Sequence, residues 1–181
     1  ERIAFVFDKR AVSFTGLASN AEAPRKAKDG EYLPALDWWR PPYMASFRAG
    51  NFDFVVLAAH IRWAGSDEAA RLPELRLLAD WVKHRVKQRF VTDKDVIVAG
   101  DFNIPSTQSP LYKAITAKGL KIPKALLGVT GSDLAEKKRY DQILHLPSFT
   151  HAFTNHGGVL DFYAGDHRPL FPWSRMDKRE F

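Results

Sequence analysis

Apolar positions in this chain group into short strand-like runs and one longer stretch with helical spacing. The runs Tyr43–Arg48 and Phe52–His60 flank the turn sequence Ala49-Gly50-Asn51, which predicts a β-hairpin. Over residues 71–90 the apolar side chains recur every three or four positions, which predicts an amphipathic helix. A second, short helix is expected over Leu111–Lys118.

Further strands complete the predicted pattern. They are expected at Arg2–Phe7 paired with Ala11–Thr15 around Asp8-Lys9-Arg10, at Asp95–Ala99, at Tyr140–Leu146 and at Val159–Tyr163. Residues 16–42 are rich in Ala, Lys, Pro and Gly and are expected to form a long loop. Helices alternate with strands in places and hairpins occur in others, so the pattern predicts an α/β domain.

Composition narrows the class of protein. The 181 residues are 45% hydrophobic, enough for one globular domain with a sizeable core. The net charge of +6 favours polyanionic partners, although a solvated basic face is the commoner cause of such a balance. With no cysteine there is no disulfide framework, thiolate zinc site or cysteine nucleophile, which fits the cytoplasm slightly better than a secreted protein. No run is long and apolar enough to predict a membrane span.

One strand end carries a candidate for chemistry. The β-branched run Val96–Ala99 predicts a buried strand, and Gly100 ends it where the backbone passes close to another group. On an extended segment residues two apart share a face, so Asp101 and Asn103 are expected side by side. A carboxylate beside an amide suits a phosphate, an attacking water and a hard cation. A simple Asp/Asn turn explains the same residues equally well.

Three more polar groups stand at or beside the ends of strand-like runs. They are His60, Asp141 and the pair Asp166-His167. Together with Gly100–Asn103, in this order, they resemble the strand-ending His, GDxN, YD-hydrophobic-hydrophobic and (S)DH motifs of the endonuclease/exonuclease/phosphatase superfamily, which includes DNase I and the abasic-site endonucleases. Gly165 stands where that family usually has Ser, a departure that leaves Asp and His in place.

The resemblance implies a DNase I-like fold, a four-layer α/β/β/α sandwich. It covers nearly all of this chain, but the family's first strands, with an Asn and a metal-binding Glu, have no counterpart here. Glu1 stands where an ER-x-x-F-x-F segment of the family supplies a glutamate. Residues 1–181 are therefore expected to be the C-terminal two-thirds of one such domain, and the chain alone is expected to bind Mg²⁺ weakly and to be nearly inactive.

The resemblance also assigns roles to the first group of residues. Asp101 and Asn103 would position water and phosphate, with Asp166 and Asp101 on the side of the metal. Mg²⁺ is the expected ion, since oxygen ligands suit a hard cation, and Mn²⁺ could replace it.

The two histidines would each pair with an acid. The expected pairs are His60 with Glu1 and His167 with Asp141. A neighbouring carboxylate fixes the imidazole tautomer, and a histidine so held can serve as acid, as base or as a cation facing the phosphate. Which histidine does which is left open.

Other candidate substrate-binding residues each have two interpretations. Arg40 resembles the family's R-x-P-x-x-x-x-F arginine, which reaches a substrate phosphate, but a packing arginine is equally consistent. Trp38, Trp39 and Trp173 could stack on bases, although packing is the safer interpretation.

His145, His151 and His156 are a possible zinc site by number alone. They have ordinary loop residues around them and no cysteine partner, so surface positions are expected instead.

Three function hypotheses follow. The leading one is a metal-dependent nuclease that hydrolyses phosphodiester bonds of DNA or RNA. The second is a phosphoesterase of a small or lipid substrate, similar to an inositol phosphatase or a sphingomyelinase, since the superfamily shares one site. The third is a non-catalytic binding module of the same fold. Retention of six polar site residues argues against the third: His60, Asp101, Asn103, Asp141, Asp166 and His167.

Overall fold

The structure, a computed structural model, describes residues 2–160 except 24, 29–30, 35–36, 64, 66, 92, 134, 152 and 155. For residues 25–28 and 31–34 it describes the backbone only. Glu1, Asp166, His167 and Trp173 therefore lie outside the described residues, as does most of the strand predicted at Val159–Tyr163.

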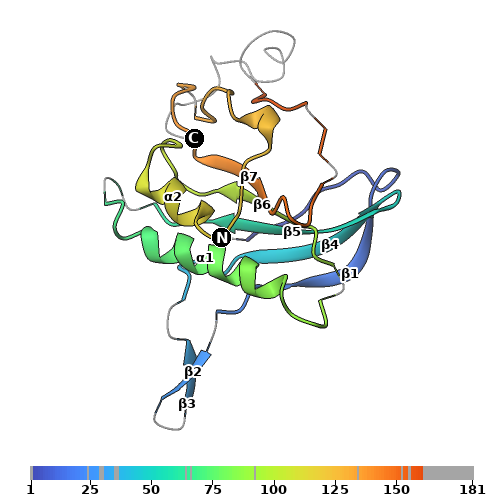
Figure 1. The fold of residues 1–181 in the computed structure, drawn as a ribbon, viewed down its shortest axis with the longest axis horizontal. Coiled ribbons are helices and arrows are strands. Elements are labelled where there is room, and N and C mark those ends of the chain that lie inside the picture. Colours follow the sequence, from blue (N-terminus) through green and yellow to red (C-terminus); the bar gives the residue numbers. More distant parts are fainter. Residues whose placement is uncertain are drawn as a thin grey trace.

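The central element is a five-stranded sheet with the order β1-β4-β5-β6-β7 (Figure 1). Its strands are β1 (Ser13–Asn20), β4 (Tyr43–Ala49), β5 (Phe52–His60), β6 (Val96–Asp101) and β7 (Asp141–His145). Only the β5–β6 pair is parallel; the other pairs in this sheet are antiparallel. A parallel pair needs a crossover, and the chain between these two strands contains helix α1 (Leu72–Arg85).

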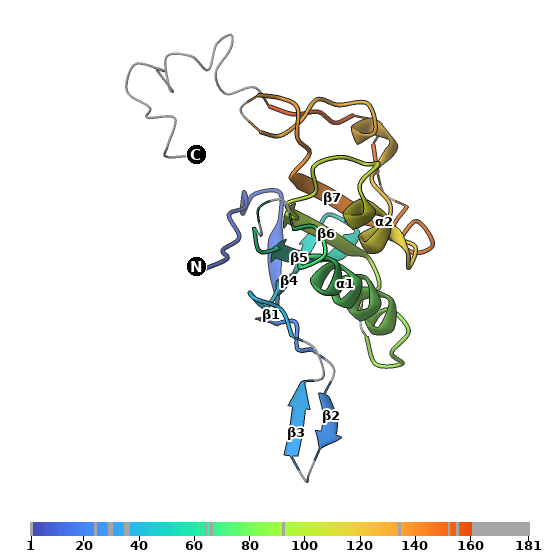
Figure 2. The ribbon, with the colours of Figure 1, turned by 90° about the vertical axis from the view of Figure 1, so that its left-hand side faces the viewer.

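The helices lie together on one face of the sheet (Figure 2). Besides α1 these are α2 (Pro110–Thr116) and the short 3₁₀ helix η1 (Lys124–Leu126). The core forms between this helical layer and the sheet. Its fully buried side chains come from α1 and α2 and from alternate positions of the strands, and include Leu75, Leu78, Val82, Leu111, Leu57, Val98 and Leu144.

The opposite face of the sheet carries a cluster of aromatic rings. Phe47 of β4 lies at its centre, with the rings of Phe5, Phe7, Phe14 and Phe54 at centroid distances from 5.2 to 6.1 Å. The segment before β1 therefore packs across this face, away from the helices (Figure 2). The predicted strand over Arg2–Phe7 is wrong, because the alternating phenylalanines pack onto β4 and form no strand ladder.

The long loop predicted over 16–42 is also wrong in part. Residues 16–20 continue β1, which pairs with β4. Within the same region β2 (Arg25–Lys28) and β3 (Glu31–Pro34) pair antiparallel and project away from the large sheet (Figures 1 and 2). Val159 and Leu160, the described part of the last predicted strand, are not in a strand.

The remaining elements match the prediction with shifted ends. The hairpin of β4 and β5 is confirmed, as are β6, β7 and α2. Helix α1 ends at Arg85, several residues earlier than predicted, because Lys87 bonds back to the His84 carbonyl in a tighter turn. Among the described residues no helix is both long and apolar enough to cross a membrane.

Candidate active site

Three of the predicted site residues lie in one row across neighbouring strands. His60, the last residue of β5, pairs in register with Asp101, the last residue of β6. Asp101 in turn pairs with Asp141, the first residue of β7. Since the flanking Ala59 and Gln142 are buried toward the helices, the row projects from the opposite face of the sheet. The register thus brings together three groups that are far apart in sequence.

Within the row, His60 and Asp101 form the closest polar pair. His60 Nε2 lies 3.7 Å from Asp101 Oδ2, and both side chains are about one-third exposed. At this distance the two groups attract each other as an ion pair when the imidazole is protonated, without a hydrogen bond between these atoms. The acid expected beside His60 was Glu1, which lies outside the described residues. Asp101 is the acid that the structure places there.

Gly100 permits the close approach of β6 to β5. Its φ of +137° suits glycine, and a Cβ atom built on it would lie 2.1 Å from the Ala59 carbonyl oxygen. The prediction that the backbone passes close to another group at Gly100 is confirmed. This close approach sets the spacing of the two strands one residue before His60 and Asp101.

Asn103 does not share an extended face with Asp101. Its φ of 51° turns the chain, and its backbone N–H donates to Asp101 Oδ1 at 2.8 Å. The side chain is only 5% exposed, and its Nδ2 donates to the Ile61 carbonyl at 2.7 Å. The expectation of two side chains pointing the same way is therefore wrong. The short polar side chain instead tolerates the left-handed turn and links the loop after β6 to the end of β5.

Sequence reasoning missed Arg71, which holds this turn from the other side. Its side chain is 3% exposed, and its guanidinium donates to the carbonyls of Asn103 and, at 3.3 Å, Gly65. The guanidinium carbon also lies 5.3 Å from the centroid of the Trp63 ring. Arg71 stands four residues before Leu75, on the buried stripe of α1. A charged residue on an apolar stripe is the signal that would have found it.

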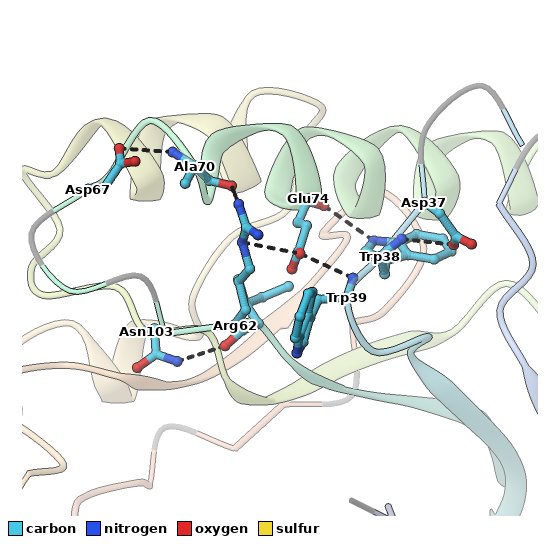
Figure 3. A network of polar contacts seen from close by, with 9 residues as sticks. Asp37, Trp38, Trp39, Arg62, Asp67, Ala70, Glu74 and Asn103 are labelled. Atoms are coloured by element: carbon cyan, nitrogen blue, oxygen red, sulfur yellow. Dashed lines mark hydrogen bonds and ion pairs between the residues drawn. The ribbon is translucent and has the colours of Figure 1, made fainter.

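The segment that carries Arg40 is fastened to α1 by Glu74 (Figure 3). Glu74 Oε1 accepts the Trp39 N–H at 3.1 Å, and its backbone carbonyl accepts Trp38 Nε1 at 3.3 Å. Arg62 completes the network, with Nε 3.8 Å from Glu74 Oε1 and Nη2 donating to the Ala70 carbonyl at 3.0 Å. Trp38 is buried in the core, as packing predicts.

The neighbouring indole has the opposite environment. Trp39 is 67% exposed, with the Arg62 guanidinium carbon 6.0 Å from its ring centroid. Arg40 follows directly and is half-buried.

Asp141 is exposed, and its backbone N–H donates to Ser132 Oγ at 3.0 Å. Its predicted partner, His167, and the second predicted metal ligand, Asp166, both lie outside the described residues. Among the described residues no group of three His, Cys, Asp or Glu side chains is close enough to hold a metal ion. Asp101 and Asp141 do supply neighbouring carboxylates, the donor chemistry that Mg²⁺ prefers.

The three histidines considered as a zinc site lie in different environments. His145 is 9% exposed, and its ring centroid lies 4.2 Å from that of Phe153. The surface position expected for it is therefore wrong, because β7 turns this side chain inward. Burial lowers the pKa of His145, and a hydrogen bond that the imidazole donates to the backbone of Thr150 partly offsets this. His151 and His156 are exposed as predicted.

This fold has counterparts among solved structures. An endonuclease/exonuclease/phosphatase family protein from Bacteroides thetaiotaomicron superposes with a TM-score of 0.52 and 19% identity, covering 78% of this chain and 54% of that one. A mannosyl-6-phosphatase from the same species gives 0.52 and 18%, covering 78% and 55%. A protein of unknown function from Enterococcus faecalis gives 0.50 and 14%, covering 77% and 56%.

No protein-family model matches the sequence, and no curated protein matches it. The solved structures show that the chain has the DNase I-like α/β fold of the endonuclease/exonuclease/phosphatase proteins, so the predicted α/β, DNase I-like class is confirmed. Of the four layers expected, the described residues form one helical layer and one five-stranded sheet. It spans about half the length of these solved chains.

Proposed function

We propose that this protein is a metal-dependent phosphodiesterase that hydrolyses nucleic acid. The observation that carries the proposal is the register of His60, Asp101 and Asp141 at adjacent strand ends, with His60 and Asp101 3.7 Å apart. His60 and Asp101 stand at the carboxyl ends of the parallel strands β5 and β6, which is where open α/β sheets gather ligand-binding groups. An imidazole beside carboxylates supplies the groups that phosphodiester hydrolysis needs.

The roles proposed for these residues follow from the reaction. A phosphodiester is anionic, so its cleavage requires a stabilised phosphate, an aligned water and a proton for the leaving oxygen. His60, held by Asp101, would face the phosphate or move a proton. Since Nδ2 of Asn103 is bonded to the Ile61 carbonyl, the part proposed for Asn103 in orienting the water or the phosphate would fall to its Oδ1. Asp101 with Asp166 would hold Mg²⁺ or Mn²⁺, which supplies charge stabilisation when bound.

A second histidine pair is proposed from the sequence motifs. His167 with Asp141 would supply the other acid–base group, and Glu1 would add a second acid near His60. Asp141 lies beside Asp101 in the sheet register, which supports its part in this arrangement.

Charge supports a polymer substrate. The net charge is +6, and basic residues occur at Arg40 and in the projecting segment Arg25–Lys28. A nucleic acid contacts a protein through several phosphates besides the one that is cleaved, whereas a small phosphoester has few such contacts.

A small phosphoester is the second candidate. One of the proteins that share this fold is a mannosyl-6-phosphatase. The same site chemistry serves a nucleic acid and a small phosphoester, so the two candidates share the row of site residues.

The experiment compares kcat/KM for duplex DNA, single-stranded RNA and mannose 6-phosphate across a NaCl series, with MgCl₂ or EDTA. The protein is used with any flanking sequence that it carries naturally, because the match covers only 54% of the similar chain. We expect cleavage of a polymer, loss in EDTA, and a KM that rises steeply between about 50 and 200 mM NaCl.

A matched variant tests the phosphate contact. Arg40→Ala should reduce the logarithmic salt slope by about one unit if its guanidinium holds a phosphate. Nearly salt-independent turnover of mannose 6-phosphate, with neither polymer cleaved, would transfer the protein to the second class.

A further inference from the structure

An aromatic pair spans the same three strand ends as the row of polar site residues. The rings of Trp63 and Tyr140 meet edge to face, with centroids 5.7 Å apart and an interplanar angle of 75°. Trp63 follows His60 by three residues, and Tyr140 directly precedes Asp141. The pair therefore connects the segment after β5 to the start of β7, and β6 with Asp101 lies between these two strands.

Trp63 is exposed but held in place. Its side chain is 59% exposed, although an indole is among the most favourable groups to bury. On one side the buried guanidinium of Arg71 lies 5.3 Å from its ring centroid. The same guanidinium donates to the Asn103 carbonyl, so one arginine fixes both the exposed indole and the turn of a proposed site residue.

The backbone of Tyr140 is hydrogen-bonded to the segment that carries Asp101 and Asn103. Its carbonyl accepts the N–H of Phe102, the residue between Asp101 and Asn103, at 2.8 Å. The aromatic pair is thus anchored to both loops that carry the proposed site residues. Such a pre-ordered ring loses little conformational entropy when a flat ligand stacks on it.

We propose that Trp63 is a stacking residue for a nucleobase that adjoins the phosphate bound at His60, Asp101 and Asp141. This inference rests on the proposed function and names the part of the substrate that the site recognises. A nucleobase is flat and aromatic, so it matches an exposed indole, and a nucleotide's charge matches the +6 chain. The base would lie on Trp63 while Tyr140 and Arg71 keep the indole from turning.

The test measures binding of three probes by calorimetry in MgCl₂: adenosine 5′-monophosphate, ribose 5-phosphate and mannose 6-phosphate. The cation is included because the carboxylates of Asp101 and Asp141 would otherwise repel the phosphate of every probe. Stacking should make the nucleotide bind about 5- to 150-fold tighter than ribose 5-phosphate. Trp63→Leu should abolish that preference and leave ribose 5-phosphate binding unchanged, and Trp63→Tyr should retain part of it.

Two further variants locate the effect. Phe90→Leu is the matched control, because Phe90 is also an exposed ring beside an arginine, Arg89, at 5.8 Å. It should keep the full preference. Trp39→Leu tests a second exposed indole among the described residues and should keep the preference as well.

Several results would overturn the proposal. They are equal binding of nucleotide and ribose 5-phosphate, equal weakening of both probes by Trp63→Leu, loss of the preference in Trp39→Leu, and tightest binding of mannose 6-phosphate. Failure of the proposed function is a separate result: no phosphoester would be cleaved, while the preference that depends on Trp63 would persist.

Discussion

Gly100 is the residue at which β6 approaches β5 most closely. Replacing it with alanine would place a methyl group 2.1 Å from the Ala59 carbonyl oxygen in a left-handed backbone conformation. We expect Gly100→Ala to lower the free energy of unfolding by more than about 2 kcal/mol, since both the clash and the conformation are unfavourable. Denaturant unfolding measures the change.

Gly50 provides the matched comparison. Its φ is also positive, at 59°, but nothing lies within 4 Å of the position that an alanine methyl group would take. Gly50→Ala should therefore cost only the conformational part, about 1 kcal/mol. Equal losses in the two variants would show that the approach of β6 to Ala59 has no energetic consequence.

His145 should make stability depend on pH. Burial lowers its pKa in the folded protein, whereas the unfolded chain takes up a proton near the ordinary value of about 6.5. The unfolded state then binds more protons, so the free energy of unfolding falls as the pH drops from about 7 toward the lowered folded value. His145→Gln should flatten this fall.

Denaturant unfolding at a series of pH values between about 5 and 7.5 makes the comparison. His84→Gln serves as the control, because His84 is exposed on α1 and should leave the slope unchanged. A wild-type slope retained in full by His145→Gln would assign the pH dependence to other groups.

At the scale of elements, two side chains at the start of α1 bond segments that carry proposed site residues. Arg71 bonds the loop after β6, and Glu74 bonds the segment before β4. Glu74→Gln removes the charge that faces Arg62 in a buried network. We expect it to lower the free energy of unfolding by about 1–3 kcal/mol and to speed hydrogen exchange at the Trp39 amide.

The control is an ion pair between α1 and Lys118, which follows α2. Asp80 lies 3.1 Å from Lys118, and both side chains are well exposed. Asp80→Asn should change the free energy of unfolding by less than about 1 kcal/mol, because water screens such pairs. Glu74→Gln is compared directly with this control. If it lowers the free energy of unfolding no more than Asp80→Asn does, and hydrogen exchange at the Trp39 amide is unchanged, then Glu74 does not hold the segment before β4 on α1.

Elements were predictable where local pattern and packing agree. The β4–β5 hairpin has apolar runs on both sides of a Gly-Asn turn, so sequence and structure coincide. Arg2–Phe7 has the same alternation, but its Phe5 and Phe7 rings pack onto Phe47 and form no ladder. Apart from Leu17, residues 16–20 carry small or polar side chains. Their strand depends on pairing with β4, which no local pattern shows.

At the scale of the whole molecule, the site depends on which strands are neighbours. The motifs pointed to His60, Asp101 and Asp141, but their row exists because β6 lies between β5 and β7. Strand order follows from long-range packing, so the sequence around these residues does not reveal it. Trp63 was missed for the same reason, because its importance comes from contacts with Arg71 and Tyr140 across the fold.

The most direct test of the proposed site is the activity of His60→Ala with its stability measured in parallel. His60 is about one-third exposed at a strand end, so its loss should change the free energy of unfolding by less than about 1 kcal/mol. If it takes part in phosphodiester hydrolysis, kcat should fall by about 100- to 10,000-fold. His151→Ala, at an exposed position, should leave kcat unchanged. A His60→Ala protein with near wild-type kcat and unchanged stability would contradict the assignment.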